Sequence, residues 1–387
     1  MRINSSRIGF PLVATLALAS SLACSKTSKA PTPLAATALP SGAALKPWDA
    51  SKQTKARPQG MVALGDKVWV AVTNLKLGPY GYTDPGGPGM LVGVVPSTGA
   101  QTIIDLGGAD EHGCSNSGYV RTDGSKLFAS CTGTYDTTDA SGKAIVEADP
   151  ATGLVTRRVA TPAGFVPSGL AAATGKIWVG DSTSARLFSV DRATFAIADG
   201  ANADHPAITL PCSDGSTFIS DVAFIGGDIY ALCSASAGYI VRLDAATGAV
   251  KGTPQLVGAI PVALTATGDG RIAVANSVSA TLSLVTATAT AMTVEKDLVT
   301  FDQSAALQDV RSRGNFLYVV ASGTQSVIKV DLAAKGGPAK VAASPTGASS
   351  NPYNIVPLDD DQTVVSNLGT DSVVAANLAV LPPVTAK

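Results

Sequence analysis

The stretch PSGLAAATGKIWVGDSTSARLFSVDRAT, at residues 167–194, contains three short apolar segments at 169–173, 176–180 and 186–190. Clusters of Asp, Ser, Thr and Gly separate them, and such residues favour tight turns. Apolar runs bounded in this way are typical of antiparallel strands. A unit of this size cannot bury its own apolar faces, so its recurrence along the chain predicts a repeat architecture.

The unit occurs seven times in the chain, including the copy quoted above. Positions equivalent to Trp178 are spaced 43 to 59 residues apart, at Trp69, Phe128, Tyr230, Ala273, Tyr318 and Val364. In five units a polar residue ends the third segment 13 or 14 residues later, at Asp191, Asp244, Thr286, Asp331 and Asn377. Seven units of about 46 residues predict an all-β fold, a seven-bladed β-propeller of four-stranded antiparallel blades over residues 58–380. Six or eight blades are the alternatives.

At these residues the chain resembles the YVTN family of β-propeller repeats. The resemblance is carried by VWVAVTN (68–74), IWVGDSTSARLFSVDRAT (177–194), IYALCSASAGYIVRLDAATGAV (229–250), IAVANSVSATLSLV (272–285) and LYVVASGTQSVIKVDLA (317–333). It implies the propeller fold. It does not fix a function, because such propellers serve as binding scaffolds, enzymes and surface proteins alike.

Residues 1–23 have the pattern of an export signal, with Arg2 and Arg7 ahead of an apolar segment too short to span a membrane. Cys24 follows Ser-Leu-Ala, which resembles the lipobox of bacterial lipoproteins, whose cysteine is diacylated. Ordinary cleavage after Ala23 is the alternative. The resemblance implies anchoring to the outer membrane through lipid; without the lipid, the protein would be periplasmic or secreted.

Residues 24–57 are rich in Ala, Ser, Thr, Pro and Lys and predict a flexible tether, and residues 381–387 a short tail. Residues 43–45 are a candidate for the strand that closes the ring, since closure by one terminus removes the last free sheet edge. Disorder throughout the tether is the alternative.

Composition narrows the classes of partner. The chain has 387 residues, 45% of them hydrophobic, and a net charge of −1. Nucleic-acid affinity comes largely from phosphate neutralisation by clustered Lys and Arg, and this sequence has no such cluster. We expect a monomer that binds an envelope or extracellular protein, or a small ligand, and that meets the membrane only through its lipid.

Four cysteines remain once Cys24 is assigned to lipid. Cys131 and Cys233 each lie three residues after the aromatic position of their unit, and Cys114 and Cys212 lie in the loops that enter the same units. The start of strand one and the end of strand two share one end of a hairpin, so we predict the disulfides Cys114–Cys131 and Cys212–Cys233. Disulfides form in oxidising compartments, so this prediction agrees with export of the protein. Free buried thiols and a metal site are the alternatives.

Loops after the second strands and before the first strands should share one face of the ring. Insertions in blades 1 and 2 place a polar and aromatic set there, and irregular loops on a rigid scaffold commonly bind ligands. The candidate ligand-binding residues are Asn74, Tyr80, Tyr82, Asp84, His112 and Tyr135, with Asp110, Glu111 and Asp136 beside them. A solvated loop surface with no binding role is the alternative.

The starts of the first strands form a second candidate site, a ring of polar residues around the channel mouth: Gln59, Ser168, Asp221, Gln308, Asp309 and Asn354. Asp221 and Asp309 are candidate ligands for a hard cation such as calcium. Capping of nearby backbone amides is the alternative that we favour, and it is the role expected of Asp181, Asn276 and Asn367 after second strands.

Enzymatic interpretations find little support in the sequence. It contains only two histidines, His112 and His205. Related propeller folds include streptogramin lyases, which work with a His and a metal, and gluconolactonases, which bind calcium through a Glu and Asn residues; neither set matches residue by residue. We therefore expect a non-enzymatic binding or scaffold protein of the cell envelope, with a metal-dependent lyase or lactonase acting at the channel mouth as the alternative.

Overall fold

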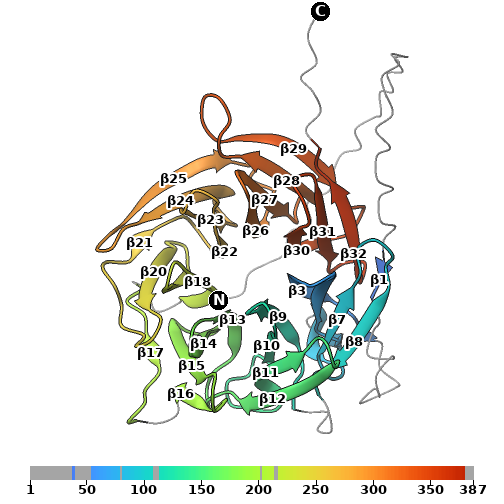
Figure 1. The fold of residues 1–387 in the computed structure, drawn as a ribbon, viewed down its shortest axis with the longest axis vertical. Coiled ribbons are helices and arrows are strands. Elements are labelled where there is room, and N and C mark those ends of the chain that lie inside the picture. Colours follow the sequence, from blue (N-terminus) through green and yellow to red (C-terminus); the bar gives the residue numbers. More distant parts are fainter. Residues whose placement is uncertain are drawn as a thin grey trace, which may run out of the picture. The chain divides into compact units, whose positions relative to one another are not determined.

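The structure is a computed structural model that describes residues 37–39, 54–78, 81–107, 113–200, 203–212 and 217–379. It contains seven four-stranded antiparallel sheets arranged as the blades of a propeller, as the sequence predicts (Figure 1). In blades 1 to 6 the strand that comes first in the chain lies innermost, and the following strands lie progressively further out; blade 7 follows the same order from its innermost strand but takes its outermost strand from the N-terminal side of the chain. The described residues contain no helix, and hence none that could cross a membrane.

The strands follow the chain from blade to blade. Blade 1 consists of β3 (Pro58–Leu64), β4 (Lys67–Val72), β7 (Met90–Val94) and β8 (Gln101–Asp105), and blade 2 of β9 (Ser117–Thr122), β10 (Leu127–Thr132), β11 (Lys143–Asp149) and β12 (Leu154–Ala160). Blade 3 consists of β13 (Pro167–Ala172), β14 (Lys176–Asp181), β15 (Arg186–Asp191) and β16 (Ile197–Asp199), and a short fifth strand, β17 (Ile208–Thr209), also pairs with β15. Blade 4 consists of β18 (Phe218–Ile225), β19 (Asp228–Ser234), β20 (Tyr239–Asp244) and β21 (Gln255–Leu256).

Blades 5 to 7 complete the ring. Blade 5 consists of β22 (Pro261–Ala266), β23 (Ile272–Asn276), β24 (Thr281–Ala287) and β25 (Met292–Thr300), and blade 6 of β26 (Leu307–Arg313), β27 (Phe316–Ala321), β28 (Ser326–Asp331) and β29 (Ala339–Pro345). Blade 7 consists of β30 (Pro352–Pro357), β31 (Gln362–Asn367) and β32 (Ser372–Asn377), with β1 (Thr37–Ala38) as its outermost strand.

The aromatic repeat position explains how neighbouring blades adhere. Trp178 is fully buried and packs with Ile229 and Leu243 of the next blade, and its indole N–H donates to the carbonyl of Ala245 at 2.9 Å. Each of the other six equivalents also belongs to a cluster shared with the following blade. Val364 shares its cluster with Met61 of blade 1, so the apolar packing runs around the whole ring.

The N-terminal side of the chain closes the ring, with a different segment from the one expected. Thr37 and Ala38 pair with Val373 and Ser372 on the outer edge of blade 7. The sequence around them carries no strand pattern, because a two-residue edge strand needs only backbone groups. Residues 43–45 lie outside the described residues. Closure in this way covers the last free edge of the sheet.

A further sheet, which the sequence does not predict, is built by the insertion in blade 1. β5 (Leu75–Gly78) and β6 (Gly81–Pro85) form a hairpin, and β2 (Thr54–Lys55) pairs with β5. Just after β2, the backbone N–H of Arg57 donates to Asp371 of blade 7 at 2.8 Å. The incoming chain is therefore tied to both blades that meet at the closure.

Both predicted disulfides are present. Cys114 is bonded to Cys131 and Cys212 to Cys233. The equivalent position in blades 3, 5 and 7 is held by Asp181, Asn276 and Asn367, all fully or almost fully buried. Asp181, for example, accepts hydrogen bonds from the backbone N–H and hydroxyl of Thr183. One position at the end of the second strand thus fastens the adjacent loop by a covalent bond in two blades and by hydrogen bonds in others.

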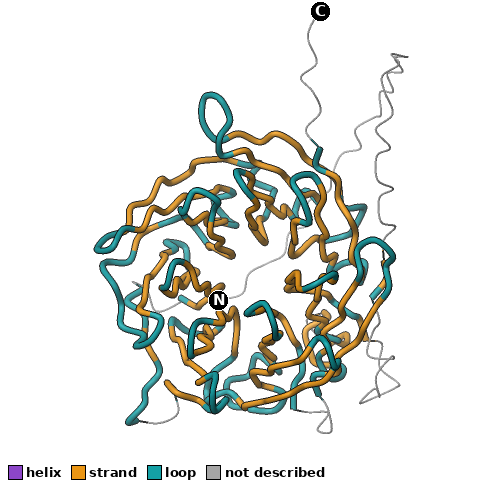
Figure 2. The backbone as a smooth tube through the Cα atoms, viewed as in Figure 1, coloured by secondary structure: helices purple, strands orange, loops and turns teal. Residues whose placement is uncertain are grey.

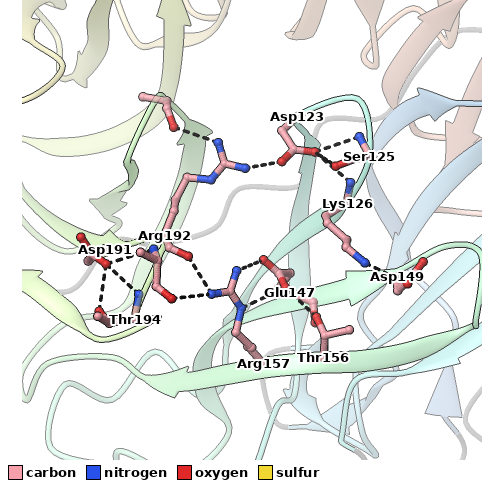
Figure 3. A network of polar contacts seen from close by, with 12 residues as sticks. Asp123, Ser125, Lys126, Glu147, Asp149, Thr156, Arg157, Asp191, Arg192 and Thr194 are labelled. Atoms are coloured by element: carbon pink, nitrogen blue, oxygen red, sulfur yellow. Dashed lines mark hydrogen bonds and ion pairs between the residues drawn. The ribbon is translucent and has the colours of Figure 1, made fainter.

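Two faces of the ring can now be defined. The entry face carries the loops that enter first strands and follow second strands, such as 113–116 and 133–142, and the turn face carries the turns that join first to second strands and third to fourth strands. On the turn face, Arg192 of blade 3 forms an ion pair with Asp123 of blade 2, and Arg157 pairs with Glu147 (Figure 3). Asp191 accepts the N–H groups of residues 193 and 194, which closes its turn.

Candidate functional site

A cavity of about 360 Å³ opens at the entry face, where the innermost strands of the blades converge. All seven of these strands contribute lining residues. In Figure 2 the innermost strands surround the centre of the ring. The volume is at the lower end of the range usual for small-molecule sites.

One position of the innermost strand recurs around this cavity and is called here the ring position. It is occupied, from blade 1 to blade 7, by Gly60, Tyr119, Gly169, Asp221, Ala263, Asp309 and Asn354. Six of these seven residues line the cavity, and Gly169 is the exception. The ring position therefore decides much of the chemistry that a bound molecule would meet.

Three ring positions hold the next blade by a side-chain hydrogen bond. The carboxylate of Asp309 accepts the N–H of Ile355 at 3.0 Å, and the amide oxygen of Asn354 accepts the N–H of Met61 at 3.0 Å. Asp221 accepts the N–H of Leu264 at 3.3 Å. The capping role favoured from the sequence is thus present in this structure, with the partner in the following blade.

Two other ring positions are glycines because the next blade passes too closely for a side chain. A Cβ on Gly60 would lie 2.8 Å from the carbonyl oxygen of Gly118, and one on Gly169 would lie 2.7 Å from the Cα of Asp221. Distances below about 3 Å between such atoms are strongly repulsive. Here the innermost strands pack directly against each other.

Two arginines that the sequence analysis did not single out complete the charged groups of the cavity. Arg121 reaches past blade 3 and forms an ion pair with Asp221 at 2.9 Å, and Arg311 pairs with Asp309 on its own strand at 3.2 Å. The carboxylates are almost wholly buried, whereas the arginine side chains keep 19% and 18% of their surface exposed. The four formal charges cancel within the cavity.

Burial perturbs the titration of Asp309. Loss of hydration raises the pKa of its carboxyl above the ordinary value, even though the charge of Arg311 and the N–H of Ile355 act in the opposite direction. Asp309 therefore retains a proton to a higher pH than an exposed aspartate does.

Tyrosines form the walls of the cavity. The hydroxyl of Tyr119 donates to the carbonyl of Ser220 at 3.0 Å, which joins blades 2 and 4 across blade 3. Burial raises the pKa of Tyr119 and of Tyr353 well above the ordinary value for a phenol. Both hydroxyls are consequently neutral hydrogen-bonding groups at physiological pH.

Tyr135 stands at the rim with 60% of its surface exposed, on the loop 133–142. The buried ammonium of Lys143 holds this loop by donating to the carbonyls of Asp136 and Asp139. The side chain of Asn116 also donates to the carbonyl of Gly133 at 3.1 Å. These bonds, with the adjacent Cys114–Cys131 disulfide, fix the loop over the cavity.

The structure distributes the sequence-predicted site residues between two places. Tyr135, Asp221 and Asp309 line the cavity together with the polar ring residues of the other blades. Asn74 lies elsewhere: it is fully buried and donates to the carbonyl of Pro88 at the base of the blade 1 insertion.

The other predicted loop residues lie on the blade 1 insertion or outside the described residues. Tyr82 and Asp84 lie on β6, which pairs with β5. Tyr80, Asp110, Glu111, His112 and the lipidation candidate Cys24 lie outside the described residues.

The residues that sequence reasoning missed are Tyr119, Arg121, Arg311 and Tyr353. Arg311 lies two residues after Asp309, and Tyr353 lies directly before Asn354. Extending the inward-facing alternation from Asp309 by one step would have included Arg311. Tyr119 and Arg121 lie on the innermost strand of blade 2, where the sequence singled out no strand-start residue.

A metal centre is not assembled by the residues that the structure describes, since no group of three His, Cys, Asp or Glu side chains is positioned to hold an ion. Asp221 and Asp309 each face a guanidinium group, which competes with a cation for the carboxylate. Calcium at these two residues stays a hypothesis of the sequence analysis.

Comparison with known proteins identifies the fold. The sequence matches no family model and no curated protein. Among solved structures, virginiamycin B lyase from Staphylococcus aureus is 14% identical with a TM-score of 0.58, covering 84% of this chain and 96% of the lyase. Kuenenia stuttgartiensis hydrazine synthase is 13% identical with a TM-score of 0.63, covering 86% and 99%. The RRP9 WD40 repeats are 10% identical with a TM-score of 0.60, covering 89% and 100%. At these identities the likeness shows a β-propeller and leaves the function open.

Proposed function

We propose that this protein is an exported, lipid-anchored binding protein of the cell envelope that holds a small ligand in the cavity at the entry face. The observation that carries the proposal is the cavity itself, which is lined by all seven innermost strands and contains aromatic, amide, hydroxyl and ion-paired groups. A concave site with a few convergent polar groups is the usual form of a small-molecule site.

Binding without conversion is supported by the state of the groups that line the cavity. The carboxylates of Asp221 and Asp309 are each engaged by a guanidinium and by a backbone N–H of the next blade. The phenols are neutral, for the reason given above. Among the described lining residues there is no histidine, cysteine or lysine. A general base or a nucleophile would need a group that these contacts leave available.

Export and anchoring are supported by two features. Disulfides persist in oxidising compartments, and this chain has two. The sequence before residue 24 has the pattern of a secretory signal and resembles a lipobox at Cys24. Mass spectrometry of the mature N-terminus tests this part: diacylglycerol on Cys24 supports the anchor, and an unmodified terminus contradicts it.

The binding part is tested on the full chain exported as the Cys24→Ser variant, which would remain unlipidated. A small-molecule library is screened by thermal shift with and without chelator and calcium, and each hit is re-examined after incubation. A hit recovered unchanged supports binding. A hit that is consumed only when calcium is present would replace this proposal with the metal-dependent lyase or lactonase.

A further inference from the structure

The charges of the cavity are balanced in a way that disfavours charged ligands. The guanidinium groups of Arg121 and Arg311 are each paired with one buried carboxylate. An anion would bind close to two carboxylates, and a cation close to two guanidinium groups. In a partly desolvated site an unpaired charge is costly. A neutral molecule meets neither penalty.

The remaining polar groups suit a ligand rich in hydroxyls. Gln59, Gln308 and the phenol of Tyr353 line the cavity, and such neutral groups can both donate and accept. A ligand with several hydroxyls can both donate to and accept from these groups, which replaces the hydrogen bonds that they lose with water on binding.

Aromatic side chains provide flat surfaces at the mouth. Tyr135 stands at the rim, and Phe218, at the start of the innermost strand of blade 4, also lines the cavity. The C–H face of a sugar ring packs well against an aromatic face, while the hydroxyls at its edge form hydrogen bonds. A cavity of about 360 Å³ has room for one or two such rings.

We infer that the ligand of this cavity is a neutral carbohydrate of one or two sugar rings, bound through the amides of Gln59 and Gln308, the phenol of Tyr353 and the ring of Tyr135. This inference rests on the proposed function and specifies its ligand class. Arg121 and Arg311 contribute hydrogen-bond donors, and their paired carboxylates cancel their attraction for anions.

The test is isothermal titration of the full chain, as the Cys24→Ser variant, with sugars of matched size. The neutral probes are glucose, N-acetylglucosamine, maltose and cellobiose, and the charged probes are glucuronate and glucosamine. We expect at least one neutral sugar to bind, with an affinity that changes less than about twofold between low and high salt. Its charged counterpart should bind at least about tenfold more weakly.

Variants locate the binding. Tyr135→Ala should weaken the affinity for that sugar about tenfold, and Tyr135→Phe should retain most of it because the ring is kept. Gln59→Ala should weaken it about threefold or more. The matched control is Phe224→Ala, which removes a partly exposed aromatic ring away from the cavity and should leave the affinity unchanged.

The outcomes separate the inference from the proposed function. Tight, salt-dependent binding of glucuronate or glucosamine, lost in Tyr135→Ala, overturns the ligand class and leaves the proposed function standing. Equal affinities in Tyr135→Ala, Gln59→Ala and the parent chain overturn this inference, because the sugar would then bind elsewhere. Absence of binding to every sugar also overturns it, and failure of the wider library would then overturn the proposed function.

Discussion

The entry face and the turn face of this propeller are built from the same strands but stabilised differently. On the turn face, Asp191 and its equivalents close short turns with local hydrogen bonds, and partly exposed ion pairs such as Arg192–Asp123 join neighbouring blades. On the entry face, disulfides, buried Asp and Asn side chains and a buried Lys hold irregular loops around a cavity. The polar groups of the regular turns form hydrogen bonds within the turns themselves. On the entry face, by contrast, several polar side chains line the cavity.

The largest expected effect comes from removing the covalent fastening of the entry face. Replacement of both Cys114 and Cys131 by Ser should lower the free energy of unfolding by about 3 kcal/mol, since the bond closes a loop in the unfolded chain. Urea denaturation measures it. The Cys212–Cys233 pair is the replicate, and a loss under about 1 kcal/mol in both would show that the loops are held without their disulfides.

The second effect compares one ion pair on each face. Asp221→Ala leaves Arg121 partly buried without its partner and removes a hydrogen bond to the next blade, so we expect a loss of about 3 kcal/mol. The matched variant Asp123→Ala breaks a more exposed inter-blade pair and should cost about 1 kcal/mol or less. Equal losses, measured by urea denaturation, would contradict the distinction between the faces.

The third effect is a pH dependence of opposite sign on the two faces. On the turn face, burial acts against ionisation of Asp123, but the N–H groups of Lys126 and Ser125 and the charge of Arg192 prevail and lower its pKa to about 2. Its stabilising effect is therefore present above its unfolded pKa and disappears as the pH falls toward 2. Asp123→Asn should be destabilising at pH 7 and progressively less so in acid.

Asp309 should behave in the reverse manner. Its folded pKa is raised, so the folded state binds its proton more tightly than the unfolded state does. Its ionisation costs stability as the pH rises from the unfolded pKa through the folded pKa. The free energy of unfolding of Asp309→Asn, measured relative to that of the parent chain, should therefore increase as the pH rises through this range. If the two free energies changed in parallel with pH, the raised pKa of Asp309 would be refuted.

The smallest expected effect concerns the loop over the cavity. Lys143→Met keeps the apolar stem and removes the buried ammonium, so stability should change by less than about 1 kcal/mol. Amide hydrogen exchange in residues 133–142 should nevertheless become faster, because two carbonyls lose their donor. Unchanged exchange there would show that the disulfide and Asn116 alone fix the loop.

Much of the fold could be predicted because the repeat position contributes directly to packing. Trp178 and its equivalents pack between blades, so their spacing in the sequence is the spacing of the blades. The same register placed the cysteines at one end of each hairpin, and both disulfides are confirmed.

Other features could not be predicted because they depend on contacts between distant segments. The closing strand Thr37–Ala38 pairs through its backbone and has no side-chain signature. Arg121 meets Asp221 only because the innermost strand of blade 3 carries Gly169 where a side chain would intervene. The candidate cavity therefore combines two kinds of residue. Some, such as Asp309, could be predicted from their place at the start of a first strand. Others, such as Arg121, take part through contacts that exist only once the ring has formed.

Hydrogen–deuterium exchange of the full chain with and without the best-binding compound tests the central claim most directly. We predict protection in peptides that cover the innermost strands β9, β18, β26 and β30 and the loop 133–142, with the turn face unchanged. Protection confined to the turn face or to the outer strands, with the innermost strands unaffected, would contradict the assignment of the ligand site to this cavity.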